Sequence, residues 1–355
     1  MDDSTRAVYE ECADEWARRR PPRLGKEAAA FSHRCLPDRP IVDLGCGPGS
    51  YFAALGRPLV GVDGARAMLR RARATTPGVA LVQADLAQLP FARRSFGGAW
   101  ARASYLHLRR PDLPAALAHL HHALAVGAPL ELTMRSGTAD GPLPDDEFPG
   151  RFFAGWQADD LAAVVVGAGF DLVEAVTVGG EWLTVRATAA PTLPDFVGDG
   201  MRVLVCGLNP SVVAADAGYG YAGATNRFWR AAVRAGLVGA DHARQPLAML
   251  GRERVGMTDL VKRATPRARE LRPADYRAGA VRVTALVEWL HPAVVLFVGL
   301  AGYRAAVARG AHPGWQEPFG GVPTYVMPST SGLNATASLS ELVEHLRAAG
   351  AGAAP

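Results

Sequence analysis

Three acidic residues end apolar runs in the first half of the chain, and alternating glycines follow the first of them. The acids are Asp43, Asp63 and Asp85, and the glycines are Gly45, Gly47 and Gly49. Glycine is needed where a backbone turns sharply or comes close to a ligand, because a Cβ would clash there. A carboxylate at a strand end can accept the hydrogen bonds of ribose hydroxyls. The spacing therefore predicts a nucleotide-like cofactor site; the alternative is a glycine turn flanked by solvated acids.

This segment resembles the class I S-adenosylmethionine-dependent methyltransferases. Its glycines alternate, unlike the GxGxxG loop of dinucleotide-binding folds, and an acid stands just before them. The likeness covers about residues 5–188 and extends to Tyr9, Ala13 and Trp16 on the opening helix and to the segment 123–130. It implies that S-adenosylmethionine is the cofactor. The residues that would bind it are Asp43, Gly45, Gly47, Gly49, Asp63 and Asp85.

The sequence leaves the methyl acceptor unknown. Enzymes that methylate amino groups of DNA carry a Pro-Pro-aromatic motif where this chain has 102–108, and no Pro-Cys nucleophile of the cytosine-carbon type is present. His107 is either a catalytic base or, as we favour, a neutral histidine packed at the edge of the cofactor site. Phe152, Phe153 and Trp156 either line an acceptor pocket or belong to the core.

Two loops of the second half place amide and hydroxyl groups after apolar runs. The run 203–206 leads into Gly207-Leu208-Asn209-Pro210, and a later run leads into the hydroxyl-rich loop 328–334. The carboxyl ends of parallel strands are where α/β proteins form their sites, and exposed backbone N–H groups in such loops suit phosphate. The two loops are therefore predicted to hold a nucleotide together.

Four motifs of this half resemble the mismatch-specific uracil and thymine DNA glycosylases. They occur in order over about residues 201–347, as 207–210 with Tyr221, 226–229, 256–266 and 326–331. The resemblance implies hydrolysis of the bond between deoxyribose C1′ and a uracil (or a thymine or damaged pyrimidine) mispaired with guanine in double-stranded DNA. Neither a cofactor nor a metal is expected for this step. The base must first be swung out of the duplex.

The same resemblance assigns roles to single residues. Asn209 would position the attacking water, Tyr221 would stack on the extruded base, and Leu333 would wedge into the gap left in the helix. The expected base pocket consists of Gly207, Leu208, Tyr221 and Ser329. The expected wedge and phosphate contacts are Ser331, Gly332, Leu333 and Asn334. Because an Asn amide cannot accept a proton, the enzyme is expected to be slower than one with a carboxylate base.

Two further positions matter for this pocket. Ser211 stands where the family has glycine, and it is expected to crowd the pocket or to alter which base fits. Asp259 occupies a position that is Asn, Lys or Asp in relatives. It is counted with Asn209 among the catalytic candidates, either activating water or reading the base edge; the alternative is that it caps a following helix.

The start of the helix expected at 226–235 carries both apolar and basic residues. Asn226 is expected to cap the helix and to brace the catalytic loop, with Trp229 in the core. Arg227, Arg230 and Arg234 share one helical face. They form either a phosphate-facing stripe or a solvated surface.

Composition and charge describe a globular protein with a basic second half. Hydrophobic residues make up 49% and charged residues 20% of the 355, which excludes a disordered chain. Residues 1–200 hold 21 Lys and Arg against 24 Asp and Glu (−3), whereas residues 201–355 hold 17 against 10 (+7). A polyanionic partner is thus expected only for the second half. Four cysteines without paired spacing, no long apolar run and no signal-peptide pattern predict a cytoplasmic protein without a membrane partner.

Apolar runs alternate with helical stretches along the whole chain, which predicts an α/β fold. We expect two three-layer α/β/α domains, a Rossmann-like methyltransferase fold at 1–188 followed by a uracil-DNA glycosylase fold at 201–349. Residues 189–200 are expected to be a linker and 350–355 a flexible tail. Ser338 and Glu341 form the pattern of a capping box for the last helix.

Three functional hypotheses remain open at this point. The first is a glycosylase of base-excision repair fused to a methyltransferase. The second is a protein that acts principally as a methyltransferase, on a small molecule or nucleic acid, with the glycosylase fold as a nucleic-acid-binding module. The third is that both halves act on one nucleobase pathway. The presence of Asn209, Tyr221 and Leu333 favours the first over the second.

Overall fold

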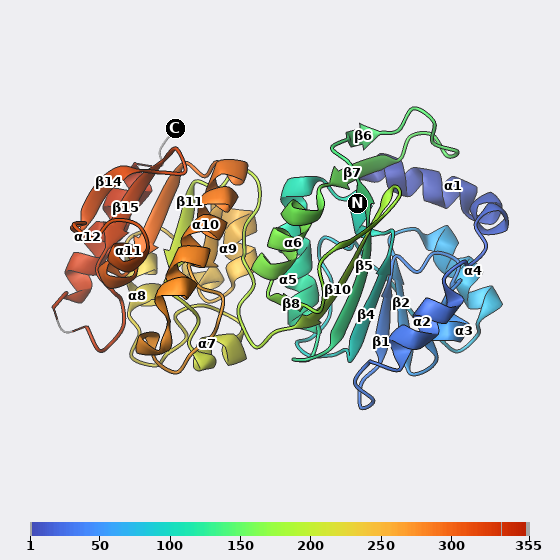
Figure 1. Cartoon of the computed structure of the whole chain (residues 1–355), viewed down its shortest axis with the longest axis horizontal. Helices are drawn as coiled ribbons and strands as arrows, with labels where there is room; N and C mark the ends of the chain where they lie inside the picture. The colour runs from blue at the N-terminus through green and yellow to red at the C-terminus, as the bar shows by residue number, and fades with distance from the viewer. Residues whose placement is uncertain (1, 335, 353–355) are drawn as a thin grey trace. The chain divides into compact units, whose positions relative to one another are not determined.

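The computed structural model describes residues 2–334 and 336–352, which form two α/β units (Figure 1). Unit 1 comprises Met1–Val166 and Phe170–Ala190, and unit 2 comprises Pro191–Pro355 together with Gly167–Gly169. Each unit is built on its own sheet. The predicted fold class, two successive α/β domains, is confirmed.

Unit 1 contains a ten-stranded sheet whose main path runs β3-β2-β1-β4-β5-β10-β8. The strands of this path are β1 (Ile41–Leu44), β2 (Leu59–Asp63), β3 (Ala80–Gln83), β4 (Gly98–Arg102), β5 (Pro129–Ser136), β8 (Phe170–Leu172) and β10 (Trp182–Ala189). Three short strands extend it, β6 (Asp140–Pro142), β7 (Phe152–Trp156) and β9 (Thr177–Gly179). The first five strands of the path pair in parallel. The acids at the ends of β1, β2 and β3 therefore face the same edge of the sheet.

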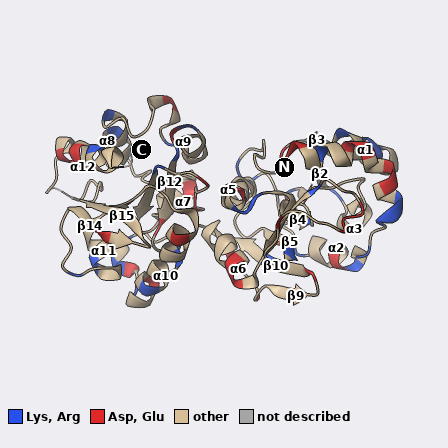
Figure 2. Cartoon of the chain, turned by 90° about the horizontal axis from the view of Figure 1, so that it is seen from above, with Lys and Arg blue, Asp and Glu red and all other residues tan. Residues whose placement is uncertain are grey.

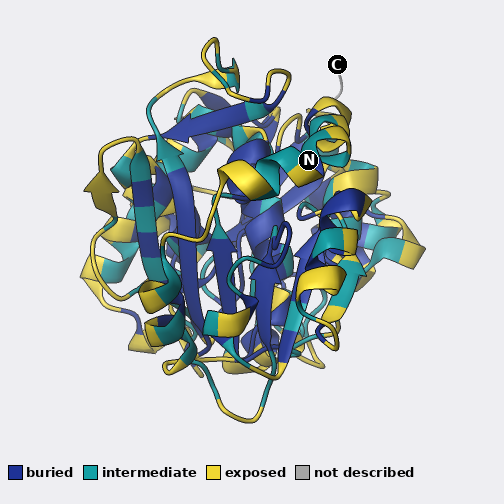
Figure 3. Ribbon diagram, turned by 90° about the vertical axis from the view of Figure 1, so that its right-hand side faces the viewer, coloured by how far each residue is buried: buried dark blue, intermediate teal, exposed yellow. Residues whose placement is uncertain are grey.

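Helices cover both faces of this sheet (Figure 1). On one face lie α2 (Gly25–Ser32), α3 (Phe52–Leu55) and α4 (Arg66–Thr75), and on the other α5 (Leu113–Ala123) and α6 (Ala158–Gly167). The opening helix α1 (Asp3–Arg19) contacts α4. Figure 3 shows the central strands buried between helices whose outer faces are exposed. All four residues of β1 are buried, as expected for a parallel strand covered on both faces.

Unit 2 contains a five-stranded sheet of order β12-β11-β13-β15-β14. Its strands are β11 (Val203–Gly207), β12 (Val255–Asp259), β13 (Val294–Val298), β14 (Gly314–Phe319) and β15 (Val322–Met327). All pair in parallel except the edge strand β14. Figure 2 shows α8 (Phe228–Arg234), α9 (Pro246–Glu253) and α12 (Leu339–Ala351) on one face, and α10 (Pro273–Leu290) and α11 (Leu300–Ala306) on the other. The short helix α7 (Val212–Ala217) follows β11.

Short 3₁₀ turns and helix ends complete the two units. The 3₁₀ turns are η1 (Tyr105–His107), η2 (Arg110–Asp112), η3 (Ala240–His242) and η4 (Ala268–Glu270). The predicted capping box is present, because the Ser338 hydroxyl accepts from the Glu341 N–H and the Glu341 carboxylate accepts from the Ser338 N–H. Of the tail predicted at 350–355, the first two residues end α12, and 353–355 lie outside the described residues. No described helix is both long and apolar enough to cross a membrane.

The segment expected as a linker, 189–200, is divided between the two units. Ala189 is the last residue of β10. From Pro191 onward the chain belongs to unit 2, where Leu193 and Phe196 are buried. Phe196 also exchanges two backbone hydrogen bonds with Met257 of β12, with N···O distances of 2.8 and 2.9 Å. The sequence predicted a linker here, but the apolar residues of this segment extend the core of unit 2.

Asp195 of the same segment lies in a buried cluster of charges. Its carboxylate accepts from Thr258 Oγ1 (2.6 Å) and forms ion pairs with Lys262 Nζ (2.9 Å) and Arg282 Nη1 (2.5 Å). Burial alone would raise the pKa of Asp195, but the attraction of Arg282 and Lys262 lowers it below its ordinary value. Two cations thus share one buried anion. Removing that anion would deprive both cations of their ion-pair partner and leave only the nearby carboxyl group of Asp259 to offset them.

We therefore predict that Asp195→Ala strongly destabilises unit 2. Breaking a buried ion pair by removing one partner costs about 3–5 kcal/mol, so the thermal unfolding midpoint of unit 2 should fall by several degrees. Differential scanning calorimetry measures this shift. The matched control is Glu288→Ala on α10, which removes an exposed carboxylate and should leave the midpoint unchanged. Equal midpoints for the two variants would contradict the role given to Asp195.

Candidate functional sites

Three glycines with left-handed backbone angles shape the loop after β1. The φ angle is +70° at Gly45, +53° at Gly47 and +80° at Gly49, a region that other residues rarely adopt. A Cβ added at Gly45 would lie 2.3 Å from the Cβ of Ser104. A Cβ at Gly49 would lie 2.8 Å from the Phe52 ring, so Gly45 and Gly49 are packed against the protein itself, whereas Gly47 has only the Trp16 ring within 4 Å, at 3.7 Å. Contact of this loop with a ligand stays a prediction.

Asp63 at the end of β2 fixes this loop. Its carboxylate accepts the N–H of Gly47 at 2.9 Å and the N–H of Ala65 at 2.8 Å. Burial raises the pKa of Asp63 to about 6, even though these backbone hydrogen bonds work in the opposite direction. Each carboxylate oxygen has two lone pairs, so both can accept a further hydrogen bond from a ligand.

Asp43 is the second buried carboxyl group beside this loop. It is 2% exposed, and its Oδ2 has no hydrogen-bonding partner among the described residues. Burial, with the nearby charge of Asp63, raises its pKa to about 8. A buried polar atom without a partner is costly. A ligand with donor groups, such as the ammonium and hydroxyl groups of S-adenosylmethionine, would supply the missing partner, so these residues fit that cofactor.

Asp85 lies on the same edge, two residues beyond β3, and it is exposed. The preceding residue, Ala84, donates its N–H to the Asp63 carbonyl at 3.2 Å, which places this turn beside the end of β2. The carboxylate accepts the N–H of Ala87 at 3.0 Å. All six residues that the sequence assigned to the cofactor thus come from three neighbouring strand ends.

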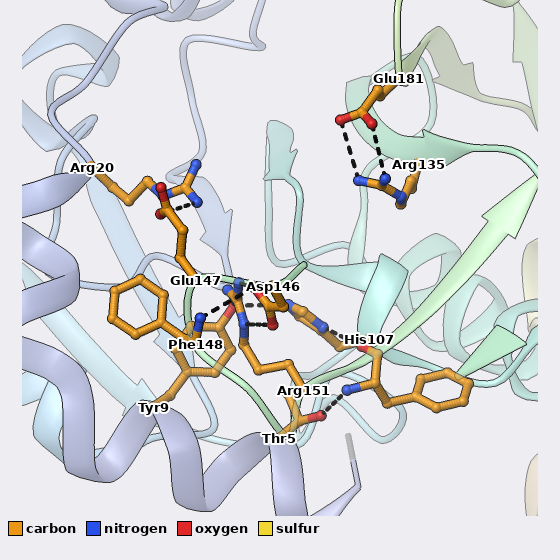
Figure 4. Close-up of polar contacts among 11 residues, drawn as sticks. Thr5, Tyr9, Arg20, His107, Arg135, Asp146, Glu147, Phe148, Arg151 and Glu181 are labelled. Atoms are coloured by element: carbon orange, nitrogen blue, oxygen red, sulfur yellow. Dashed lines mark hydrogen bonds and ion pairs between the residues drawn. The ribbon is translucent and has the colours of Figure 1, made fainter. Parts of the chain in front are cut away.

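His107 belongs to a chain of hydrogen bonds that leads from α1 to β7 (Figure 4). Its Nδ1 lies 2.6 Å from the Phe152 carbonyl oxygen and its Nε2 lies 2.8 Å from Tyr9 Oη. Because a carbonyl can only accept, Nδ1 carries the proton and Nε2 accepts from Tyr9. Arg151 in turn donates to Tyr9 Oη at 3.0 Å. Both ring nitrogens of His107 are therefore already in use.

Burial lowers the pKa of His107 to about 4, which supports the neutral histidine over a catalytic base. Arg151, which the sequence analysis missed, lies over the rings of Tyr9, Phe148 and Phe153 at 5.1–5.5 Å from their centroids and pairs with Asp146. Phe153 also packs against His107, with centroids 4.9 Å apart. These aromatic residues thus surround groups of the protein itself.

Asn209 follows β11 in unit 2, and its side-chain nitrogen is held by three acceptors. Nδ2 donates to the carbonyls of Pro210 (3.1 Å) and Arg263 (3.0 Å) and to Thr265 Oγ1 (2.8 Å). The Thr265 hydroxyl donates its own hydrogen to the Arg267 carbonyl. Since all three neighbours accept, the amide has only one reasonable orientation. Oδ1 then faces away from these groups, and no described residue donates to it.

Asp259 ends β12, beside Gly207 at the end of β11, with which it pairs in register. A Cβ added at Gly207 would lie 2.4 Å from Asp259 Oδ1 and 3.1 Å from Tyr221 Oη, so the three residues converge. No described residue donates a hydrogen bond to the Asp259 carboxylate. Burial raises its pKa to about 6, although Lys262 works in the opposite direction. The next helical element after Asp259 is η4, which begins at Ala268, so Asp259 does not cap a helix.

A small hollow with free space for about one water molecule opens beside this group of residues, so a base could enter only if its walls move apart. It is lined by Leu193, Pro194, Phe196, Gly220, Tyr221, Met257, Thr258 and Asp259. Tyr221 has a left-handed backbone (φ 58°) and stacks on Phe228, with ring centroids 4.1 Å apart and an interplanar angle of 18°. Its hydroxyl is buried without a partner among the described residues. Strained backbone and unpaired polar groups commonly gather at functional sites.

Two residues of the predicted base pocket differ from expectation. The side chain of Leu208 packs toward the core, where a Cβ added at Gly302 of α11 would lie 2.8 Å from Leu208 Cδ1. Ser329 Oγ accepts the N–H of Ser331 at 3.3 Å and so shapes its own loop. Ser211 does not crowd the pocket through its hydroxyl, because that group accepts the Ala214 N–H and caps α7. Sequence reasoning missed this because α7 is only six residues long.

The loop 328–334 presents Leu333 to solvent, 96% exposed. The Leu333 N–H donates to Ser331 Oγ (3.3 Å), and Asn334 Nδ2 donates to the Ser329 carbonyl (2.8 Å). Gly332 has no room for a side chain, because a Cβ there would lie 2.4 Å from Thr225 Oγ1. The expected wedge residue therefore stands at the tip of an internally bonded loop.

Asn226 and three arginines lie in or just before α8. Asn226 Oδ1 accepts the Phe228 N–H at 3.0 Å from one residue ahead of the N-cap position, which Arg227 occupies. Arg230 and Arg234 are exposed. The Arg227 guanidinium, in contrast, binds carbonyl oxygens of the protein and is not part of a phosphate-facing stripe.

Comparison with known protein families gives one match in each of the two units. Residues 41–127 match the family of the methyltransferase domain, and residues 194–349 match the uracil DNA glycosylase superfamily. Similar solved structures include the CcbJ methyltransferase from Streptomyces caelestis, at 19% identity over 54% of this chain and 100% of that chain, with a TM-score of 0.44. Another is 1,6-didemethyltoxoflavin-N1-methyltransferase from Burkholderia thailandensis with bound S-adenosylhomocysteine, at 20% identity over 52% and 84%, with a TM-score of 0.40.

We predict that S-adenosylmethionine binding depends on ionised Asp63. Loss of hydrogen bonds to a charged acceptor costs about 1.5–3 kcal/mol, so Asp63→Ala should weaken binding by about tenfold or more. The pKa of Asp63 is raised to about 6, so its carboxylate is present above that pH and protonated below it. Affinity of the unmodified protein should therefore fall as the pH falls through about 6. Isothermal titration calorimetry measures both effects.

The control for this experiment is Asp171→Ala, which removes an exposed carboxylate of β8 and should bind as the unmodified protein does. Binding that survives in Asp63→Ala at full strength would count against the cofactor site described above.

Proposed function

Because the chain joins a methyltransferase domain to a domain of the uracil DNA glycosylase superfamily, we propose that it is a bifunctional enzyme of DNA base-excision repair. Unit 2 hydrolyses the N-glycosidic bond of uracil mispaired with guanine, and thymine or a damaged pyrimidine is a further substrate class. Unit 1 transfers a methyl group from S-adenosylmethionine. The observation that carries the glycosylase assignment is the fixed amide of Asn209, which follows β11 two residues after Gly207, where Asp259 and Tyr221 converge.

The reaction begins when the target base leaves the duplex. A stacked base cannot reach a pocket at the end of a sheet, so it must be rotated out. Leu333 is an apolar side chain held almost entirely in solvent, and such side chains insert where a base step has been unstacked. The hydroxyls of Ser329 and Ser331 and the backbone N–H groups near them bind the flanking phosphates. The +7 charge of residues 201–355 supports contact with this polyanion.

The extruded base stacks on Tyr221, whose ring Phe228 supports from one side. Aromatic stacking accepts any base, because every base has a π face. Discrimination therefore depends on polar groups, and the unpartnered Tyr221 hydroxyl and Asp259 carboxylate are available for it. A carboxylate accepts a hydrogen bond from the N–H edge of a pyrimidine when it is ionised.

Asn209 orients the water that attacks C1′. With Nδ2 bound to three acceptors, Oδ1 accepts a hydrogen bond from that water and fixes its position. The amide cannot take a proton. Water forms a bond to C1′, the C1′–N bond breaks with its electron pair passing to the base, and the proton of the water passes to the Asp259 carboxylate. The departing base is then protonated from solvent.

In unit 1 the Gly45–Gly49 loop, Asp43, Asp63 and Asp85 would hold S-adenosylmethionine, which would supply an electrophilic methyl group. Asp43 would accept from donor groups of the cofactor and Asp63 from its ribose hydroxyls. His107 does not act as a base on the acceptor, because both of its nitrogens are bonded and its pKa is low. The acceptor is thus a group that needs no deprotonation by this histidine.

The first test is a nicking assay on duplexes that carry G·U, G·T and A·U pairs. We expect abasic sites from the unmodified protein, fastest at G·U. Misplacing a reactant by about 1 Å can cost about 10²-fold in rate, so Asn209→Ala should slow cleavage by about that factor or more. Binding of Asn209→Ala to abasic product DNA serves as the folding control. If the unmodified protein makes no abasic site in any duplex, the glycosylase assignment is lost.

The second test concerns Asp259 and pH. Because burial raises the pKa of Asp259 to about 6, its basic form prevails above that pH. The kcat/KM for cleavage should therefore fall about tenfold per pH unit below about 6. Asp259→Asn should lose about 10²–10⁴-fold in rate and lack this acidic limb. An Asp259→Asn variant with unchanged turnover on uracil-containing DNA would refute the role of Asp259.

A further inference from the structure

Residues 226–229, at the start of α8, hold the loop that carries Tyr221. Phe228 stacks on the Tyr221 ring. Trp229 Nε1 donates to the Gly220 carbonyl at 2.9 Å. Both rings are buried in the core of unit 2. The left-handed backbone of Tyr221 is thus stabilised by two adjacent aromatic residues, which fix the position of the stacking surface.

Arg227, the neighbour of Phe228, holds the other loop. Its guanidinium donates to the carbonyls of Asn334 (2.7 Å), Ser331 (3.3 Å) and Ala337. Its backbone N–H donates to the Thr330 carbonyl at 2.9 Å. One side chain therefore binds carbonyls on both sides of Leu333. A guanidinium can do this because its donors are arranged in a rigid planar fork.

The two loops also touch directly. Gly332 lies so close to Thr225, in the loop of Tyr221, that an added Cβ would meet Thr225 Cβ at 2.5 Å and its carbonyl oxygen at 2.9 Å. Leu333 is next in sequence and has no packing partner of its own, since it is 96% exposed. Its position relative to Tyr221 is therefore set by the backbone of its loop and by Arg227.

We propose that Arg227 is a positioning residue that couples insertion of Leu333 to stacking of the base on Tyr221. This inference rests on the proposed glycosylase function. Arg227 does not touch the substrate; it keeps the wedge and the stacking surface at one separation, so that a base pushed out by Leu333 arrives at Tyr221. The coupling matters only when a base must leave a stacked duplex. Uracil in a single strand needs no wedge.

The test compares uracil in a duplex with uracil in a single-stranded oligonucleotide. Arg227→Met keeps the length of the side chain and removes all its donors. We expect its kcat/KM on the G·U duplex to fall about tenfold or more, equal to about 1.4 kcal/mol, while cleavage of the single strand stays within about twofold. Arg227→Lys should show the same selective loss, because one ammonium group cannot replace the planar fork. The control is Arg309→Met, which removes an exposed arginine and should change neither rate.

A double-mutant cycle tests the coupling itself. Leu333→Ala should give the same duplex-selective loss, and adding Arg227→Met to it should cause no further loss, because the two residues act through one event. Gly332→Ala tests the same coupling without altering Arg227, since it forces the loops apart; it too should affect only the duplex. Fluorescence of 2-aminopurine placed beside the uracil should rise on binding of the unmodified protein and stay low with Arg227→Met.

Failure of the proposed function and failure of the coupling give different cleavage results. If the unmodified protein cleaves neither duplex nor single strand, the proposed function fails. If it cleaves both, and Arg227→Met and Gly332→Ala lower the two rates equally, Arg227 is merely structural and the coupling is refuted. Additive losses in the double variant would refute it as well.

Discussion

Both sites depend on a buried carboxyl group at the end of a parallel strand. Asp43 is the third of the four residues of β1, and Asp259 ends β12; burial raises their pKa values to about 8 and about 6. Each lies beside a glycine-containing strand end, Gly45–Gly49 in unit 1 and Gly207 in unit 2. Desolvating a carboxylate without a full set of hydrogen-bond donors opposes folding. Burial of apolar side chains elsewhere in each unit offsets this cost, and a bound ligand can supply the missing donors.

The charges around Asp259 explain how its carboxylate stays without a direct partner. Lys262 and Arg282 are close enough to influence its pKa, yet both form their ion pairs with Asp195. Arg282 reaches Asp259 only at its backbone carbonyl. Asp195 thus engages both cations and holds the end of β12 in place. Were Lys262 to pair with Asp259, the pKa of that carboxyl group would fall and it would become a weaker base.

Much of the fold and part of the site could be predicted from local patterns. Asn209, Asp63 and the glycine loop could be singled out because each lies at or just after the end of an apolar run, and the capping box at Ser338 needs only four residues. Other contacts could not be found this way because their partners are distant in sequence. Asp195 pairs with residues 67 and 87 positions away, and Arg227 binds carbonyls 104 to 110 positions away. The prolines near Asp195 indicated a linker, whereas its burial depends on tertiary contacts.

A single carboxylate could both orient and deprotonate the attacking water. In this chain the two tasks fall to Asn209 and Asp259. Asn209 is held by backbone carbonyls and Thr265, so its geometry is rigid but it has no basicity. Asp259 has basicity near neutral pH but no hydrogen bonds from described residues that would hold its carboxylate. A water bound by both would be oriented by the first and deprotonated by the second. Asp259 ends β12, where it pairs in register with Gly207 of β11, and Asn209 follows two residues after Gly207. A side chain at position 207 would clash with Asp259, and therefore the separation of the two roles depends on that glycine.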